Sequence, residues 1–214
     1  MNDVTSRPQA TARRKPASER LAEIIETAAA IAVAEGLDRV TAKRVAAELG
    51  VFPGLVSHYF ATADELVATA FAHAAANERE EIFGQAVLAD RPVDRMRRLL
   101  GSWLHRDRDP VSLLWLDAWQ ASRRRPALLA EVGRQMAADL DRLSAVIADG
   151  IAAGDFPVAD PAEPALQILS LVDGLSVQAA TRQTLDYAPV RAMVIATTER
   201  LLAVGPGTLA QKYF

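Results

Sequence analysis

The 214-residue sequence contains no cysteine and no long apolar run. Without cysteine, the chain has no disulfide, no thiolate zinc site and no cysteine nucleophile. No stretch reaches the roughly 18 apolar residues that a membrane-spanning helix needs, and residues 1–16 are too polar for a signal peptide. We therefore expect a cytoplasmic protein that has no membrane partner.

The signals of catalytic and metal sites are also missing. The three histidines, His58, His73 and His105, lack the spacing of a metal-binding motif such as HExxH, and there is neither a glycine-rich phosphate loop nor a GxSxG motif. We expect no metal, no cofactor and no catalytic residue. One enzymatic alternative stays open, in which a helical bundle uses Asp117 or Asp173 together with His105 and turns over a bound ligand.

Helix-forming residues dominate what is present. Half of the residues are hydrophobic, alanine, leucine, arginine and glutamate are frequent, and alternating β-strand patterns are scarce. These features predict an all-α fold of about nine helices with a sizeable core. The net charge of −3 excludes a surface that is basic throughout, so any contact with nucleic acid must be local.

Caps and prolines divide the chain into four parts. Thr41 is a natural N-cap, Gly50 ends a short helix, and Pro53 begins another. Thr62 and Glu65 have capping-box spacing and begin a long helix. We predict a disordered basic arm, a helix-turn-helix domain of three helices, a helical-bundle domain, and a tail, over residues 1–17, 18–62, 63–205 and 206–214.

The stretch ELGVFPGLVSHYF, residues 48–60, has the layout of a helix-turn-helix whose second helix is short. Val51, Val56 and Phe60 are expected to face inward. Phe52 is expected either to pack on this helix or to contact a DNA sugar. The other side chains then face outward, where they can contact base edges or phosphates in a major groove, and these are Pro53, Gly54, Leu55, Ser57, His58 and Tyr59.

The longer stretch TAKRVAAELGVFPGLVSHYFATADELV resembles the DNA-binding signature of the tetracycline-repressor (TetR) family, and VSHYF is similar to the choline-responsive betaine-pathway repressors within it. The resemblance implies a homodimeric repressor that binds a pseudo-palindromic double-stranded DNA operator and releases it when a small-molecule effector enters the C-terminal bundle. It also implies DNA contacts by Thr41, Lys43, Pro53, Gly54, Leu55, Ser57, His58 and Tyr59.

One position departs from the family pattern. Ala63 stands where the family usually has a lysine, so one phosphate contact is missing. We expect Arg13, Arg14 and Lys15 of the basic arm to compensate by reaching phosphates or an adjacent minor groove.

Two plainer interpretations compete with DNA binding. His58 can be an ordinary surface histidine and Tyr59 a core residue, but their spacing within the motif favours DNA contact. A helical scaffold that binds another protein is the second functional alternative. Salt-independent binding of a protein partner would favour that scaffold, because contacts with DNA phosphates weaken as salt rises.

The tryptophans carry the main hint of a ligand. Trp115 and Trp119 are four residues apart and share one helix face. They either fill a core or line a pocket in which a carboxylate such as Asp173 holds a cationic ligand, and the pattern leaves both open. The candidate ligand-binding residues are Phe71, Met96, Trp115, Trp119, Met136, Asp173 and Gln178.

The last two predicted helices, near residues 160–182 and 189–204, have apolar faces rich in small residues. The resemblance implies that they form a four-helix interface with a second copy, and the alternative is that they complete a monomeric bundle. A two-fold protein suits an operator of two half-sites. The candidate dimer-interface residues are Leu169, Val172, Val177, Ala192, Ile195 and Ala196.

Overall fold

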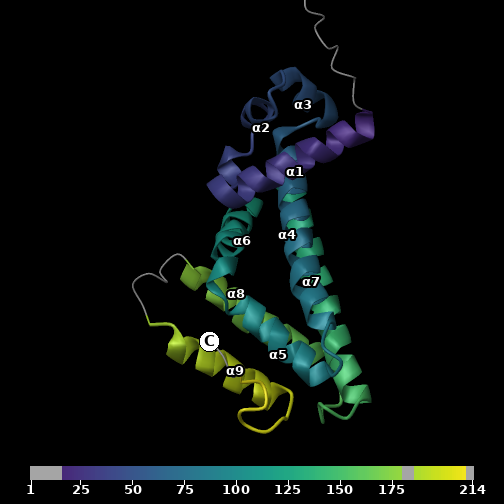
Figure 1. Ribbon diagram of the computed structural model, residues 1–214. Coiled ribbons are helices and arrows are strands. Elements are labelled where there is room, and N and C mark those ends of the chain that lie inside the picture. The colour runs from purple at the N-terminus through teal and green to yellow at the C-terminus, as the bar shows by residue number, and fades with distance from the viewer. Residues whose placement is uncertain (1–15, 180–185, 211–214) are drawn as a thin grey trace, which may run out of the picture.

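The computed structural model describes residues 16–179 and 186–210, which contain nine α-helices, two short 3₁₀-helices and no β-strand. The predicted all-α class is confirmed over these ranges (Figure 1). The α-helices are α1 (Ala17–Glu35), α2 (Ala42–Leu49), α3 (Pro53–Tyr59), α4 (Ala63–Val87), α5 (Pro92–Trp103), α6 (Asp109–Ser122), α7 (Pro126–Ala152), α8 (Ala162–Ala179) and α9 (Ala188–Leu201). The 3₁₀-helices are η1 (Leu37–Arg39) and η2 (Arg106–Arg108).

Helices α1 to α3 form a small unit at one end of the molecule (Figure 1). Thr41 caps α2, because its side-chain oxygen accepts a hydrogen bond from the backbone N–H of Arg44 at 3.1 Å. Gly50 ends α2 with a φ of 65°, a left-handed conformation that glycine adopts at little cost. Pro53 then begins α3. The turn between α2 and α3 therefore has the predicted helix-turn-helix arrangement.

Helix α4 connects this unit to the rest of the chain without a break. The side chain of Thr62 accepts from the N–H of Glu65 at 3.1 Å, and the Glu65 carboxylate accepts from the N–H of Ala61 at 2.9 Å. This is the predicted capping box, with the return bond one residue earlier than usual. From there α4 extends over 25 residues and packs against both α1 and α7.

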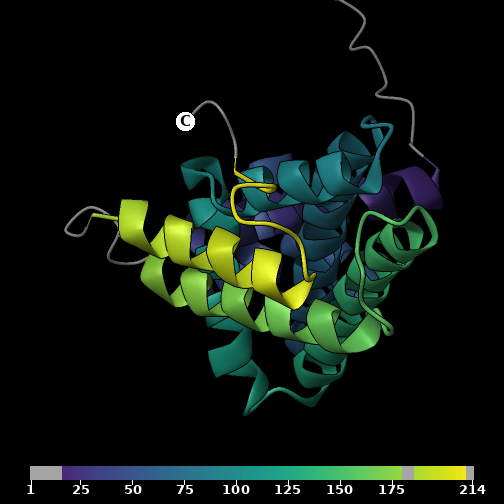
Figure 2. The same ribbon diagram turned by 90° about the horizontal axis from the view of Figure 1, so that it is seen from below.

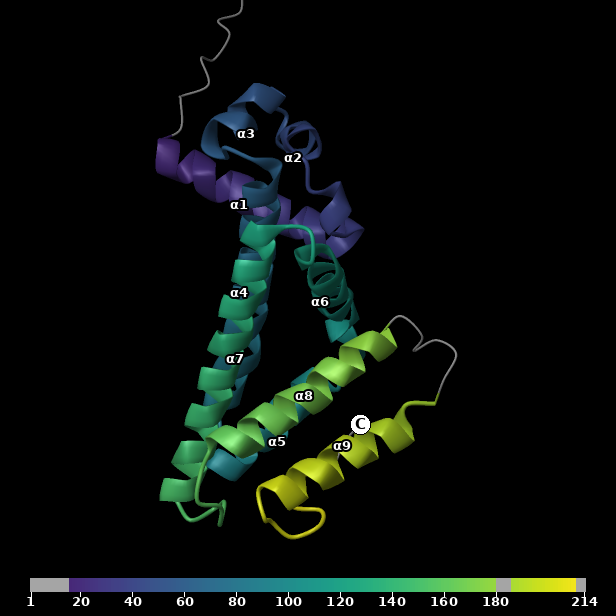
Figure 3. The same ribbon diagram turned by 180° about the vertical axis from the view of Figure 1, so that it is seen from behind.

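Beyond the three-helix unit, the helices form a triangular frame. Helices α4 and α7 lie side by side along one edge, α6 forms the second edge, and α5 with α8 forms the third (Figure 1). Helix α9 lies beside α8 in the views from behind and from below (Figures 2 and 3). Helices α8 and α9 are thus at the end of the molecule opposite to α2 and α3.

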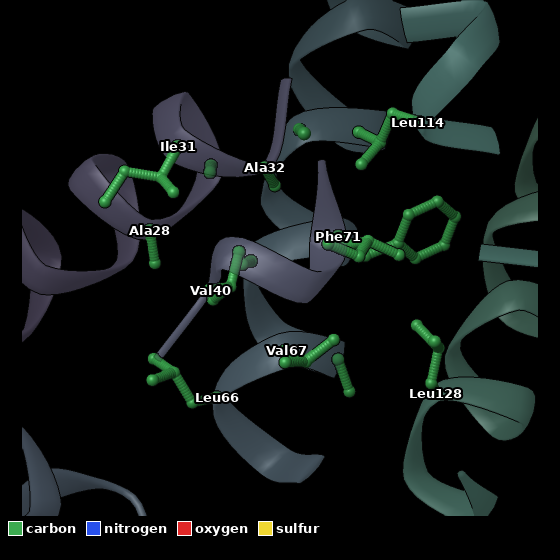
Figure 4. Close-up of a cluster of buried hydrophobic side chains, with 14 of the residues drawn as sticks. Ala28, Ile31, Ala32, Val40, Leu66, Val67, Phe71, Leu114 and Leu128 are labelled. Atoms are coloured by element: carbon green, nitrogen blue, oxygen red, sulfur yellow. The ribbon is translucent and has the colours of Figure 1, made fainter. Parts of the chain in front are cut away.

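Two hydrophobic cores hold this frame together. The first joins α1, α2 and α3 to the first half of α4 and to parts of α6 and α7. The second lies among α5, α7, α8, α9 and the second half of α4. Because the first core crosses residue 62, the helix-turn-helix unit and the bundle share side-chain packing. Figure 4 shows part of the first core, with labels on Ala28, Ile31, Ala32, Val40, Leu66, Val67, Phe71, Leu114 and Leu128.

The C-terminal segment differs from the tail predicted for residues 206–214. Leu209 is fully buried in the second core, and its N–H donates to the Glu199 carboxylate at 2.8 Å. Arg97 donates to the backbone carbonyl of Thr208 at 2.7 Å, which holds the segment against α5. Residues 206–210 therefore fold back onto the bundle, and the remainder of the predicted tail lies outside the described residues.

Gly150 of α7 is required for close packing. A Cβ at this position would lie 2.0 Å from the ring of Phe156, which is buried in the second core. We expect Gly150→Ala to lower the free energy of unfolding by about 1–3 kcal/mol, because the ring must move.

Gly133→Ala, on the same helix, is the matched control. An added Cβ meets nothing within 4 Å there, and alanine favours a helix by roughly 1 kcal/mol over glycine. Urea unfolding of both variants should therefore give shifts of opposite sign, and shifts of the same sign would contradict the packing argument.

Candidate DNA-binding surface and effector cavity

Helices α2 and α3 lie together at one end of the molecule (Figure 1). The residues predicted to face outward from α3 are therefore at this end. Leu55 and Tyr59 are half-buried rather than fully outward, and Tyr59 packs against the first core. The ring of His58 meets the ring of Tyr59 edge to face, with centroids 5.5 Å apart. The predicted outward residues that are exposed are Pro53, Gly54, Ser57 and His58.

Helix α2 adds two polar side chains, because Thr41 and Lys43 are both exposed. The Thr41 oxygen already accepts a hydrogen bond from Arg44, which leaves the hydroxyl hydrogen to donate outward. The Arg44 guanidinium is held by Glu35 and Glu48 at 2.5 and 2.7 Å. None of the ion pairs among the described residues involves Lys43, so its ammonium group is available to a partner.

The other predicted DNA contacts concern the arm and the start of α4. Arg13, Arg14 and Lys15 lie outside the described residues. Ala63 is exposed at the first position of α4, where its methyl group offers no charge to a phosphate.

A cavity of about 1240 Å³ that is open to solvent is lined by residues of α1, α4, α5, η2 and α6. Its four carboxylates face two guanidinium groups, which leaves an excess of two negative charges when both of its histidines are neutral. This charge balance favours a cation. The ionisable side chains of the wall are Glu26, His73, Glu78, Glu81, Arg98, His105, Asp107 and Arg108.

None of the seven predicted ligand-binding residues lines this cavity. Phe71 and Trp115 pack edge to face in the first core with centroids 4.9 Å apart, and Trp119 lies against Trp115 at 5.6 Å. This packing favours the core-filling interpretation of the tryptophans. Met96 is fully buried in the second core, whereas Met136 is exposed on α7. Helical spacing identified a shared face, but it does not tell whether that face meets a core or a cavity.

The other two predicted ligand residues lie on α8. Gln178 accepts from the hydroxyl of Tyr187, at 3.1 Å for both its side-chain and its backbone oxygen. Burial raises the pKa of the Asp173 carboxyl to about 6, and the nearby charge of Arg108 opposes this effect. Both side chains therefore lie near the bundle interior without reaching the cavity wall.

Glu78 of α4 and Arg108 of η2 form an almost buried ion pair in the cavity wall. Arg108 Nε lies 2.7 Å from Glu78 Oε1, and the side chains are 10% and 12% exposed. The N–H is not aligned with this oxygen, so the contact lacks a regular hydrogen bond. The Arg108 guanidinium donates to Ser112 of α6 at 3.1 Å and to Ser176 of α8 at 3.4 Å. Arg108 thus connects α4, α6 and α8.

Glu78 and Arg108 were not predicted from the sequence. The segment ANEREE, residues 76–81, has the composition of a solvated helix face. A signal was present in the spacing, because Glu78 lies four residues from Ala74 and from Ile82, which are both buried. A carboxylate in an apolar stripe indicates a buried partner or a ligand.

Helices α8 and α9 lie side by side at the surface of the bundle (Figure 2), and both have exposed apolar side chains. Among the predicted interface residues, Leu169 and Ile195 are half-buried. Val172 is only 2% exposed and belongs to the second core of its own chain, so its assignment to a dimer interface is wrong. The exposed members are Val177, Ala192 and Ala196, and the neighbouring exposed residues that the sequence analysis missed are Leu166 and Met193.

The described residues contain no group of three or more side chains that could hold a metal ion. No helix in this part of the chain combines the length and the apolarity of a membrane span.

Two residues of the enzymatic alternative have different partners. The Asp117 carboxylate accepts a hydrogen bond from the backbone N–H of Leu37 at 3.4 Å. The His105 ring lies 3.2 Å from the carboxylate of Asp107.

A helix-turn-helix with an exposed polar face, joined by one long helix to a bundle with a solvent-open cavity, is the arrangement of a ligand-responsive DNA-binding regulator. Residues 24–70 match the model of bacterial regulatory proteins of the tetR family, and residues 92–203 match the C-terminal domain of the BetI-type transcriptional repressors. The chain belongs to the tetR family of transcriptional regulators. The family and the regulatory function predicted from the motif are therefore confirmed.

Solved structures share this fold. A TetR-family transcriptional regulator from Rhodococcus sp. has a TM-score of 0.72 and 22% identity, over 86% of this chain and 99% of that chain. A transcriptional regulator from Saccharomonospora viridis, solved in complex with choline, has a TM-score of 0.69 and 21% identity, over 85% and 96%. One from Pseudomonas aeruginosa PAO1 has a TM-score of 0.70 and 20% identity, over 91% and 95%. A comparison with curated protein sequences gives no match.

The raised pKa of Asp173 makes this carboxyl a source of instability at neutral pH. Because the folded state binds the proton more tightly than the unfolded state, stability falls as the pH rises from about 4 to 6. We expect Asp173→Asn to raise the free energy of unfolding at pH 7.5 by on the order of 2 kcal/mol, with no gain at pH 4.

Denaturant unfolding at the two pH values measures this effect. Asp141→Asn, at an exposed position of α7, is the control and should leave stability nearly unchanged. A variant at Asp173 that is no more stable than the wild type at pH 7.5 would show that the fold does not penalise the charge.

Proposed function

We propose that the protein is a ligand-responsive dimeric repressor that binds a pseudo-palindromic double-stranded DNA operator. The main support is the continuity of α4, which is capped beside α3 and carries Glu78 into the wall of the cavity. A change at the cavity therefore acts on the helix that positions the DNA-binding unit. This function needs no cofactor and no catalytic residue, and a chromosomal operator places the working protein in the cytoplasm.

In the proposed complex, α3 enters the major groove. Ser57 and His58 supply most of the base contacts, because their side chains are exposed and polar. Pro53, Gly54 and the half-buried Leu55 allow close approach of the backbone. The groups assigned to phosphates or to a minor groove are Thr41, Lys43, Tyr59, Arg13, Arg14 and Lys15.

The proposed dimer interface consists of the outer faces of α8 and α9. These helices lie at the end of the molecule opposite to α3 (Figure 3), and they expose apolar and small side chains. Pairing with the same faces of a second copy would bury them by two-fold symmetry, and it would hold two α3 helices for two half-sites. Leu166, Val177 and Met193 contribute the largest exposed apolar groups.

The proposed effector is a small organic cation that enters the cavity between α1, α4, α5 and α6. Its excess of carboxylates supports a cation, and the volume of about 1240 Å³ is ample for a small molecule. Choline, the ligand of the Saccharomonospora viridis regulator, belongs to this chemical class.

The ion pair of Glu78 with Arg108 offers a route from the effector to α3. A bound cation competes with the Arg108 guanidinium for the Glu78 carboxylate. Once Arg108 is displaced, the connection between α4 and the serines of α6 and α8 changes, and α4 moves relative to them. The effector acts as an inducer because it binds the state with Arg108 displaced more tightly than it binds the DNA-bound state.

DNA binding is tested with duplex fragments from the region upstream of the protein's own gene, at two salt concentrations. We expect Ser57→Ala/His58→Ala to weaken binding at least tenfold, because good base contacts are each worth about 1–3 kcal/mol. Asp141→Asn, far from α3, should bind like the wild type. The repressor function would be contradicted if the wild type showed no sequence preference for these upstream fragments and also selected no preferred sequence from genomic fragments.

The effector class is tested by calorimetry with choline and with its uncharged isostere 3,3-dimethylbutanol. We expect choline to bind, and Glu78→Gln to weaken it roughly tenfold or more, since contacts with charged groups are worth about 1.5–3 kcal/mol. Glu80→Gln, an exposed glutamate of α4, is the matched control. Equal binding of choline and its isostere would exclude recognition of the charge.

A further inference from the structure

Phe52, in the turn between α2 and α3, belongs to neither hydrophobic core. Its side chain is 87% exposed, the highest value among the large exposed hydrophobic residues of the described chain. The first of the two expectations for Phe52, that it packs on α3, is therefore excluded. Single exposed apolar side chains are common on protein surfaces, so the meaning of this ring depends on where it lies as well as on its exposure.

Local structure does not require an aromatic residue here either. Phe52 is the N-cap of α3, a position that usually has a side-chain oxygen, and its ring caps nothing. Its backbone carbonyl accepts the N–H of Leu55 at 2.9 Å, which any residue can do. Pro53 has no N–H, so the first turn has one donor fewer to satisfy. The ring could be removed without disturbing the turn.

The position of Phe52 indicates what the ring meets. It directly precedes Pro53 and Gly54, which are both exposed at the beginning of α3. In a helix-turn-helix, the N-terminal residues of the second helix contact base edges in the major groove. The ring is thus adjacent to the proposed DNA-binding face and continuous with it.

We propose that the Phe52 ring contacts the 5-methyl group of a thymine in each half-site and thereby reads sequence. A phenyl ring has no donor or acceptor, so it cannot read the hydrogen-bonding pattern of a base. The 5-methyl group of thymine is the apolar feature that base edges present in the major groove. This inference rests on the proposed placement of α3 in that groove.

The experiment replaces thymine by deoxyuridine, which pairs identically but lacks the methyl group. An operator is first isolated by selecting genomic fragments with the wild-type protein, and its thymines are then replaced one symmetric pair at a time. We expect the wild type to lose affinity roughly three- to tenfold at one pair of positions, from the apolar contact that is removed.

Phe52 variants assign this loss to the ring. Phe52→Ala should bind the thymine operator as weakly as the wild type binds the deoxyuridine operator, and it should not distinguish the two. Phe52→Leu should retain part of the discrimination. Ser57→Ala is the matched control on the same face: it should weaken binding but keep the deoxyuridine effect. Circular dichroism should show an unchanged helix content, because the ring is exposed.

Two results would overturn the inference while leaving the proposed function intact. One is a Phe52→Ala variant that binds like the wild type. The other is a variant that weakens all operators equally and keeps the deoxyuridine effect, which would indicate a sugar contact. Wild-type protein that selects no operator would overturn the inference and the proposed repressor function together.

Discussion

The packing of α1 against α4 and α6 in the first core is the contact on which the rest of the structure depends. Ala28, Phe71 and Leu114 are fully buried or nearly so, and they come from three helices of two predicted domains. Close-packed interiors do not deform continuously, so a shift of α4 must carry α1 and the helix-turn-helix with it. A loosely attached DNA-binding unit would not respond to events in the cavity.

Partly buried charges reduce the stability that this packing gives to the bundle. Glu78, Asp139 and Asp173 are largely removed from water, and burial raises the pKa of both aspartates to about 6. Arg79 and Arg108 compensate only in part, because a buried ion pair seldom regains the full cost of desolvation. Such a set of charges contributes little to stability. Of the three carboxylates, only Glu78 lies in the cavity wall, where the proposed effector would meet it.

Because α3 is short, recognition of DNA by this helix benefits from a second copy of the chain and from residues of the turn between α2 and α3. A helix of seven residues that keeps Val56 buried and Tyr59 half-buried has few side chains left for bases. Two copies double that number, and the exposed faces of α8 and α9 provide a surface on which the copies can meet. In the proposed complex, the ring of Phe52 adds to the contact surface without lengthening the helix.

The sequence by itself determined the helix-turn-helix, because its signals are local: the cap at Thr41, the left-handed Gly50, Pro53, and the capping box at Thr62. The tertiary structure alone decided which helix faces meet. It placed Trp115 in the first core and both Val172 and Leu209 in the second core. It also paired Glu78 with Arg108, which is thirty residues further along the chain. Periodicity shows that residues share a face, whereas contacts between distant segments depend on how all the helices pack at once.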